Sequence, residues 1–174
     1  MDMAMLHAWH RALIVLLNVK GVEYLLVGGY AVRFYGGKRE TKDLDLWVPP
    51  GEPGNAARIG TALEELWGEI PGEVVEALAQ PDRIVRVGLP GVRLEVLEPV
   101  IEARPVKLGS YKGKKSWQIE FLTIQSGVEF REAYAARQVG TVEGVEVSIV
   151  SLEHLKVIKA SGGRQKDLVD LGDL

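Results

Sequence analysis

Residues 43–48 constrain the fold more than any other segment of this 174-residue chain, because polar and apolar side chains alternate there as Asp-Leu-Asp-Leu-Trp-Val. Side chains on a β-strand point alternately to the two faces of a sheet. Asp43 and Asp45 should therefore share one face, while the two leucines share the other. The pattern predicts a strand that buries its leucines in a core and carries two carboxylates on the opposite face.

Two neighbouring carboxylates repel each other, and each raises the free energy needed to ionise the other unless a cation lies between them. Mg²⁺ suits such a pair, because it binds oxygen ligands, keeps several waters and commonly uses one or two carboxylates together with substrate phosphates. Asp43 and Asp45 are therefore candidate ligands for Mg²⁺ or Mn²⁺. The structural alternative is that they only solvate the open face of a strand.

A glycine pair, Gly28-Gly29, lies between a predicted strand at 23–27 and a predicted helix at 30–35. Glycine allows the backbone to approach a phosphate closely, and the N–H groups of a following helix would face that anion. Arg39 and Thr41 come between this turn and the acidic strand. Together these segments predict a site for a metal-bound nucleoside triphosphate.

These residues resemble the signature of minimal nucleotidyltransferases of the DNA polymerase β superfamily, and the branch related to abortive-infection toxin nucleotidyltransferases is the most similar. The resemblance extends over residues 28–48, 119–130 and 151–170. It implies an α/β (α+β) fold of the polymerase β type, with a mixed central sheet flanked by helices. It also implies a single domain over residues 1–174, in which the C-terminal helical segment 151–174 completes the site.

The resemblance implies transfer of a nucleoside monophosphate from a nucleoside triphosphate to a hydroxyl acceptor, with pyrophosphate leaving. Acceptors in related proteins include RNA ends, proteins and small molecules, and some members have an antitoxin partner. Asp43, Asp45 and a third carboxylate would be the catalytic metal ligands. The residues assigned to the nucleotide on this basis are Gly28, Gly29, Arg39, Thr41, Lys159 and Arg164.

The third carboxylate is assigned to Glu120, although the family usually has an aspartate there. Glutamate keeps the charge and adds a methylene, so it retains the ability to ligate a metal with a different reach. Glu95, in the alternating segment 92–97, is the competing candidate. Glu120 is preferred because the sequence after it keeps the family's spacing, whereas Arg93 would neutralise Glu95. The glutamate also leaves open a catalytically inactive nucleotide- or partner-binding protein of the same fold, as one half of a toxin–antitoxin pair.

Lys159 follows Leu155 by one helical turn, so it lies beside an apolar stripe. An isolated lysine in this position is commonly a surface residue whose stem covers apolar area, but the resemblance assigns it to the nucleotide site. Asp167 and Asp170 are interpreted as ion-pair partners of the neighbouring basic groups rather than as substrate ligands.

Composition excludes several other classes. A net charge of −3 argues against a surface built wholly for nucleic acid. The absence of cysteine excludes disulfides and cysteine-ligated zinc. No apolar run reaches the ~18 residues that span a bilayer, and the N-terminal segment lacks the features of a signal peptide. We therefore expect a cytoplasmic protein with no membrane partner. A dinucleotide-binding oxidoreductase is disfavoured, because the glycine pair lacks the Gly-x-Gly-x-x-Gly spacing.

Lysines cluster in one glycine-containing loop, which is interpreted as a solvated hairpin tip rather than as a phosphate-binding loop; they are Lys107, Lys112, Lys114 and Lys115. The remaining pattern predicts helices at 3–19, from Asn55 to about Trp67, at 73–79, from Ser126 to about Arg137, and two after Ser151 separated by Gly162-Gly163. It also predicts a strand at 118–124 and hairpins pairing 83–87 with 92–97 and 138–142 with 145–149.

Overall fold

The computed structural model describes residues 6–88, 100–101, 118–125 and 127–174. Its helices and strands follow in the order α1 (Ala8–Val19), β1 (Leu25–Val27), α2 (Gly28–Phe34), β2 (Leu44–Trp47), α3 (Pro53–Trp67), α4 (Gly72–Leu78), β3 (Arg83–Val87), β4 (Val100–Ile101), β5 (Ile119–Leu122), α5 (Phe130–Ala135), β6 (Gln138–Val142), β7 (Val145–Ile149), α6 (Leu152–Gly162) and α7 (Gln165–Asp173).

The strands form one mixed sheet in the order β4-β3-β5-β2-β1-β7-β6. Strand β1 pairs in parallel with β7, and β2 pairs in parallel with β5, whereas the other neighbours are antiparallel. The predicted mixed sheet flanked by helices is therefore confirmed. The parallel β2–β5 pair joins segments more than 70 residues apart, so no local turn sets its register.

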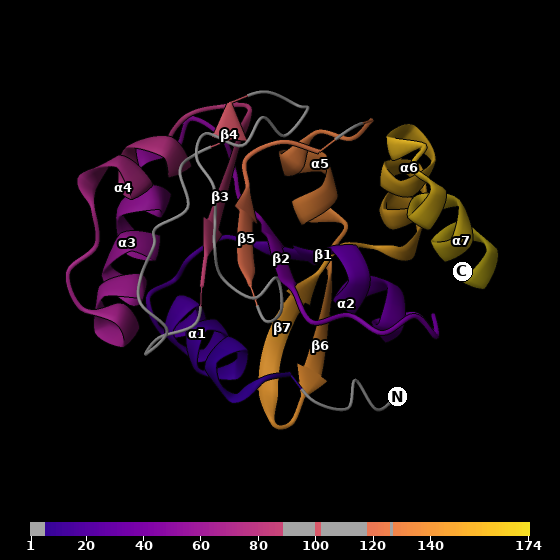
Figure 1. Ribbon diagram of the computed structural model, residues 1–174, viewed down its shortest axis with the longest axis horizontal. Helices are drawn as coiled ribbons and strands as arrows, with labels where there is room; N and C mark the ends of the chain where they lie inside the picture. Colours follow the sequence, from indigo (N-terminus) through magenta and orange to yellow (C-terminus); the bar gives the residue numbers. More distant parts are fainter. Residues whose placement is uncertain (1–5, 89–99, 102–117, 126) are drawn as a thin grey trace.

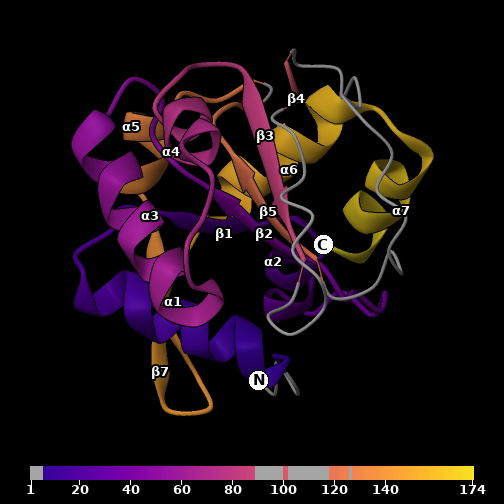
Figure 2. The same ribbon diagram turned by 60° about the vertical axis from the view of Figure 1, so that its left-hand side comes forward.

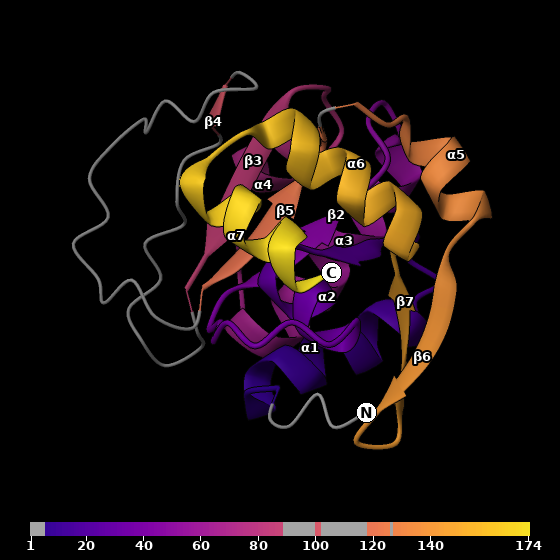
Figure 3. The same ribbon diagram turned by 90° about the vertical axis from the view of Figure 1, so that its right-hand side faces the viewer.

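Helices cover both faces of the sheet. Helices α1, α3 and α4 lie on one side, and α2, α6 and α7 lie on the other, as Figure 1 shows with the sheet between them. Turning the molecule brings the first group forward in Figure 2 and the second group forward in Figure 3. The C-terminal helices therefore lie over the face of the sheet opposite α1.

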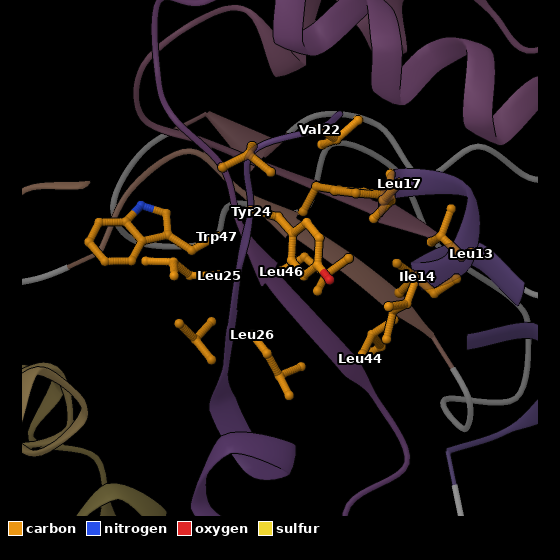
Figure 4. Packing of buried hydrophobic residues seen from close by; sticks show 14 of the residues in the cluster. Leu13, Ile14, Leu17, Val22, Tyr24, Leu25, Leu26, Leu44, Leu46 and Trp47 are labelled. Atoms are coloured by element: carbon orange, nitrogen blue, oxygen red, sulfur yellow. The ribbon is translucent and has the colours of Figure 1, made fainter. Parts of the chain in front are cut away.

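The core between α1 and the sheet contains the leucines that the alternating pattern predicted to be buried. Leu44 and Leu46 are fully buried. They lie on the same side of β2 as Leu13, Ile14 and Leu17 of α1 (Figure 4). Because burial of apolar surface is the main force that favours folding, this contact sets which face of β2 is turned inward. Asp45 is consequently presented on the other face, toward α6 and α7.

One predicted helix start is wrong. Asn55 was expected to cap a helix, but α3 begins at Pro53, whose ring already holds the backbone angle that a first helical turn requires. Asn55 is instead buried inside α3 and exchanges two hydrogen bonds with the backbone of Glu23. It therefore ties α3 to the chain that enters β1.

Helix α5 is shorter than predicted. It begins at Phe130 because Gly127 has a left-handed backbone angle, φ +84°, which a right-handed helix cannot contain. Ser126, the expected cap, lies outside the described residues. So do Glu95, the segment 92–97 expected to pair with β3, the lysines of the 107–115 loop, and residues 3–5 of the predicted N-terminal helix.

The hairpin of β6 and β7 and the two C-terminal helices are confirmed as predicted. Within the described ranges, no helix combines the length and the apolar character needed to cross a membrane.

Candidate functional site

All of the predicted site residues line one pocket of about 620 Å³, on the sheet face that α6 and α7 cover. Gly28 and Gly29 come from the start of α2, and Arg39 and Thr41 from the loop before β2. Asp43 directly precedes β2, Asp45 lies on β2, Glu120 on β5 and Lys159 on α6, and Arg164 directly precedes α7. The fold therefore brings together positions separated by up to 136 residues in sequence.

The acidic residues meet because β2 and β5 run side by side in parallel, with Asp45 paired in register with Glu120. The Asp45 side chain is hydrogen-bonded to Glu120. Burial, followed by the charge of Glu120 and this hydrogen bond, raises the pKa of Asp45 well above its ordinary value. Ionisation of Asp45 is therefore unfavourable without a cation nearby.

Asp43 lies beside this pair and accepts a hydrogen bond from the backbone N–H of Gln118 at 3.2 Å. Burial is the largest influence on its pKa, which is raised, and the nearby Glu120 raises it further. The hydrogen bond from Gln118 acts in the opposite direction. Asp43, Asp45 and Glu120 therefore form a local cluster of carboxylate oxygens within the pocket.

This donor set fits a hard divalent cation, because carboxylate oxygens that resist ionisation together are stabilised by a positive charge between them. Asp43 and Asp45 could hold such an ion. Glu120 is engaged elsewhere, since the Arg86 Nε donates to its Oε1 at 2.7 Å. In the part of the chain that the structure describes, no group of three or more acidic or histidine side chains is arranged to hold a metal ion.

The glycine pair lets Asp45 and Thr41 pack closely against the turn at the start of α2. Gly28 has φ +67°, and a Cβ there would collide with the Asp45 carboxylate. A Cβ at Gly29 would collide with the side chain of Thr41, whose hydroxyl lies 3.5 Å from the Asp43 carbonyl oxygen. Both positions therefore require glycine for space, and Gly28 requires it for its backbone angle as well.

We expect Gly28→Ala to destabilise the fold and to displace Asp45. The left-handed backbone angle costs about 1–2 kcal/mol for a non-glycine residue, and the collision adds to that cost. Gly21→Ala is the matched control, because Gly21 has nearly the same angle, φ +68°, with open space around its Cβ position. Urea unfolding should show a larger loss of unfolding free energy for Gly28→Ala than for Gly21→Ala. Equal losses would mean that the collision with Asp45 does not destabilise the fold.

The predicted nucleotide-binding cations lie in a network of ion pairs with α7. Asp170 is fully buried and accepts two hydrogen bonds from Arg39, at 2.8 and 3.0 Å. Lys159, only 4% exposed, lies 3.0 Å from Asp170 and 3.3 Å from Asp167. Arg164 pairs with Asp167 at 2.8 Å. The ion-pairing role predicted for Asp167 and Asp170 is confirmed.

The network holds both aspartates in the charged form. Burial raises the pKa of Asp170, but its hydrogen bonds with Arg39 and Lys159 outweigh burial, so the pKa is lowered overall. Burial likewise raises the pKa of Asp167, and pairing with Arg164 and Lys159 outweighs it. The charges of Arg39 and Lys159 are thus largely balanced within the protein.

Two cations that line the pocket were missed as site residues. Arg86 lies on β3, in register with Glu120 across the β3–β5 pair. Lys166 is exposed in the first turn of α7, and its charge acts on both Asp43 and Asp45. Lys166 makes no hydrogen bond or ion pair with any residue in the described ranges. Alternation along residues 83–87 was the available signal for Arg86, but its partner strand could not be identified from sequence.

A row of apolar side chains lies next to the charged pair of Arg86 and Glu120. Ile84 and Leu122 are register partners on β3 and β5, two residues from Arg86 and Glu120 and therefore on the same face. Both line the pocket, together with Ile124 of the chain after β5. The pocket is consequently charged at one end and apolar at the other.

No family model matches the chain, and no curated protein is detectably similar to it in sequence.

Proposed function

We propose that this protein is a metal-dependent nucleotidyltransferase with the polymerase β type of fold, acting on a nucleoside triphosphate and a hydroxyl acceptor. The observation that carries the proposal is the convergence of the Asp43 and Asp45 carboxylates, the glycine turn and several cations on one pocket. The pocket has both an anionic patch for a metal and basic groups for phosphates.

Asp43 and Asp45 would hold Mg²⁺ or Mn²⁺ through their carboxylate oxygens. When bound, such an ion stabilises negative charge on phosphoryl oxygens and favours formation of a nucleophile from a hydroxyl. Gly28 and Gly29 line the same pocket, so the phosphate chain would lie against the backbone of this turn, next to the metal ligands.

Lys166 is the cation best placed to meet the triphosphate. Arg39 and Lys159 are already paired with Asp170, so a phosphate would have to compete with a buried carboxylate for them. Lys166 has no such competitor in the described part of the chain. Arg39 and Lys159 would then act as positioning residues, because they hold α7 and thereby Lys166 over the pocket.

We expect Lys166→Met to weaken triphosphate binding by about 1.5–3 kcal/mol, the value of a hydrogen bond to a charged group. Its stability should be unchanged, since the side chain is exposed and unpaired within the described ranges. Lys156→Met is the control, because Lys156 is exposed on α6 outside the pocket lining. Titration calorimetry with each triphosphate and Mg²⁺ would measure both. Equal affinities for the two variants would remove Lys166 from the site.

The apolar row supports a nucleoside rather than a bare polyphosphate as the ligand. Ile84 and Leu122 offer an apolar surface to a base, within the same pocket as the groups assigned to the phosphates. A nucleoside triphosphate matches this arrangement, with charged phosphates at one end and an aromatic base, whose flat faces can pack against apolar side chains, at the other.

The direct test is to incubate the protein with each labelled nucleoside triphosphate, Mg²⁺ and total cellular RNA. The expected result is transfer of label to RNA or to protein, with release of pyrophosphate. Mg²⁺ plus triphosphate should also raise the melting temperature, because a ligand that binds only the folded state stabilises it by mass action. Absence of transfer and of any thermal shift would contradict the proposal.

A catalytically inactive nucleotide-binding protein is the second candidate. The pairing of Glu120 with Arg86 favours it, because the third carboxylate is engaged by a cation instead of being open to a metal. This candidate predicts the thermal shift without transfer. A gene next to this one that encodes a helix-turn-helix protein would favour a toxin–antitoxin setting for either candidate.

A further inference from the structure

Arg86 and Glu120 form an ion pair beside Asp43 and Asp45, the two predicted metal ligands. The Arg86 Nε lies 2.7 Å from the Glu120 Oε1, and the side chains are 18% and 19% exposed. Glu120 faces Arg86 across the β3–β5 pair and Asp45 across the β2–β5 pair. Arg86, Glu120 and Asp45 therefore form one row across three neighbouring strands.

Glu120 is hydrogen-bonded to its neighbours on both sides of this row. One oxygen accepts from the guanidinium of Arg86, and the carboxyl group is also hydrogen-bonded to Asp45. A metal that used Glu120 would have to displace Arg86 from a mostly buried, charge-assisted hydrogen bond, which is stronger than a hydrogen bond between neutral groups. A metal on Asp43 and Asp45 alone leaves the Arg86–Glu120 ion pair intact.

We propose that Arg86 is a positioning residue that withholds Glu120 from the metal, so that the pocket without a nucleotide binds a divalent cation through Asp43 and Asp45 only. This inference rests on the proposed function, because it concerns the same metal site. Its consequence is that removal of Arg86 frees a third ligand and strengthens metal binding.

The test is a Mn²⁺ titration without nucleotide, followed by the electron paramagnetic resonance signal of free Mn²⁺. Arg86→Met keeps most of the stem and removes the guanidinium, and we expect it to bind Mn²⁺ at least about tenfold more tightly than the wild type. Arg86→Lys keeps the charge and loses the Nε donor, so it should give a smaller gain. Circular dichroism would verify that each variant is folded.

Lys166→Met is the control for charge alone. Lys166 acts on both Asp43 and Asp45, but it makes no hydrogen bond with Glu120. If Arg86 acts by engaging Glu120, Arg86→Met should gain more Mn²⁺ affinity than Lys166→Met. Adding Glu120→Gln to Arg86→Met should then remove that gain in affinity. Equal gains for Arg86→Met and Lys166→Met would overturn the inference.

The two proposals fail in different ways. If the wild type binds Mn²⁺, Asp43→Asn with Asp45→Asn does not, and Arg86→Met binds with unchanged affinity, then the inference about Arg86 is wrong and the metal site stands. If the wild type, Arg86→Met and Arg86→Lys are all folded and none binds Mn²⁺, then the metal-dependent function itself is wrong.

Discussion

Replacing the Asp43 and Asp45 carboxylates by the isosteric amide, as Asp43→Asn with Asp45→Asn, is expected to abolish the stabilisation by Mg²⁺ plus triphosphate and, under the proposed function, to reduce nucleotidyl transfer by at least about 10³-fold. Loss of a catalytic metal removes several kcal/mol of transition-state charge stabilisation, and each ~1.4 kcal/mol changes the rate tenfold. Differential scanning fluorimetry and a pyrophosphate-release assay would measure the two effects.

The same double variant should be at least as stable as the wild type without metal. Burial and the charge of Glu120 raise the pKa values of both aspartates, so their charged forms are unfavourable in the folded protein. Asparagine at position 43 retains an oxygen that can accept from the Gln118 N–H. A metal response equal to that of the wild type would contradict the assignment of these ligands.

Asp170→Asn is expected to cost about 3 kcal/mol of unfolding free energy at pH 7, because it removes the buried carboxylate that pairs with both Arg39 and Lys159 and leaves the buried Lys159 with Asp167 alone. For a chain of this size the melting temperature should fall by roughly 6–12 °C. Asp173→Asn is the matched control, since Asp173 is exposed at the end of the same helix. A loss no larger than that of the control would show that the network does not stabilise the fold.

The loss of unfolding free energy caused by Asp170→Asn should also depend on pH. The pKa of Asp170 is lowered in the folded protein below its ordinary value of 3.8, so its contribution to stability is fully present above that value. The contribution is lost as the pH falls through the lower, folded-state pKa. The difference between wild type and Asp170→Asn should therefore narrow below about pH 4. Urea unfolding at a series of pH values would measure it, and a constant difference would contradict the charge assignment.

Local patterns in the sequence predicted much of the fold. The alternation over residues 43–48 identified a strand and the faces of its leucines and aspartates, because a two-residue period follows from strand geometry alone. The β6–β7 hairpin was found from its Glu143-Gly144 turn, where both residues adopt positive φ angles. The Asn55 prediction failed because a nearby proline and a contact with Glu23, 32 positions away, outweighed the local capping preference.

In the candidate site, too, some features follow from local sequence and others from long-range packing. Sequence by itself identified the acidic strand, the glycine turn and the pairing role of Asp167 and Asp170, because each depends on residue chemistry and short spacing. Only the tertiary structure decided that Lys159 is buried in ion pairs and that Arg86 engages Glu120. Those contacts depend on which distant strands become neighbours and on how α7 packs, and long-range packing leaves no periodic signal in a single sequence.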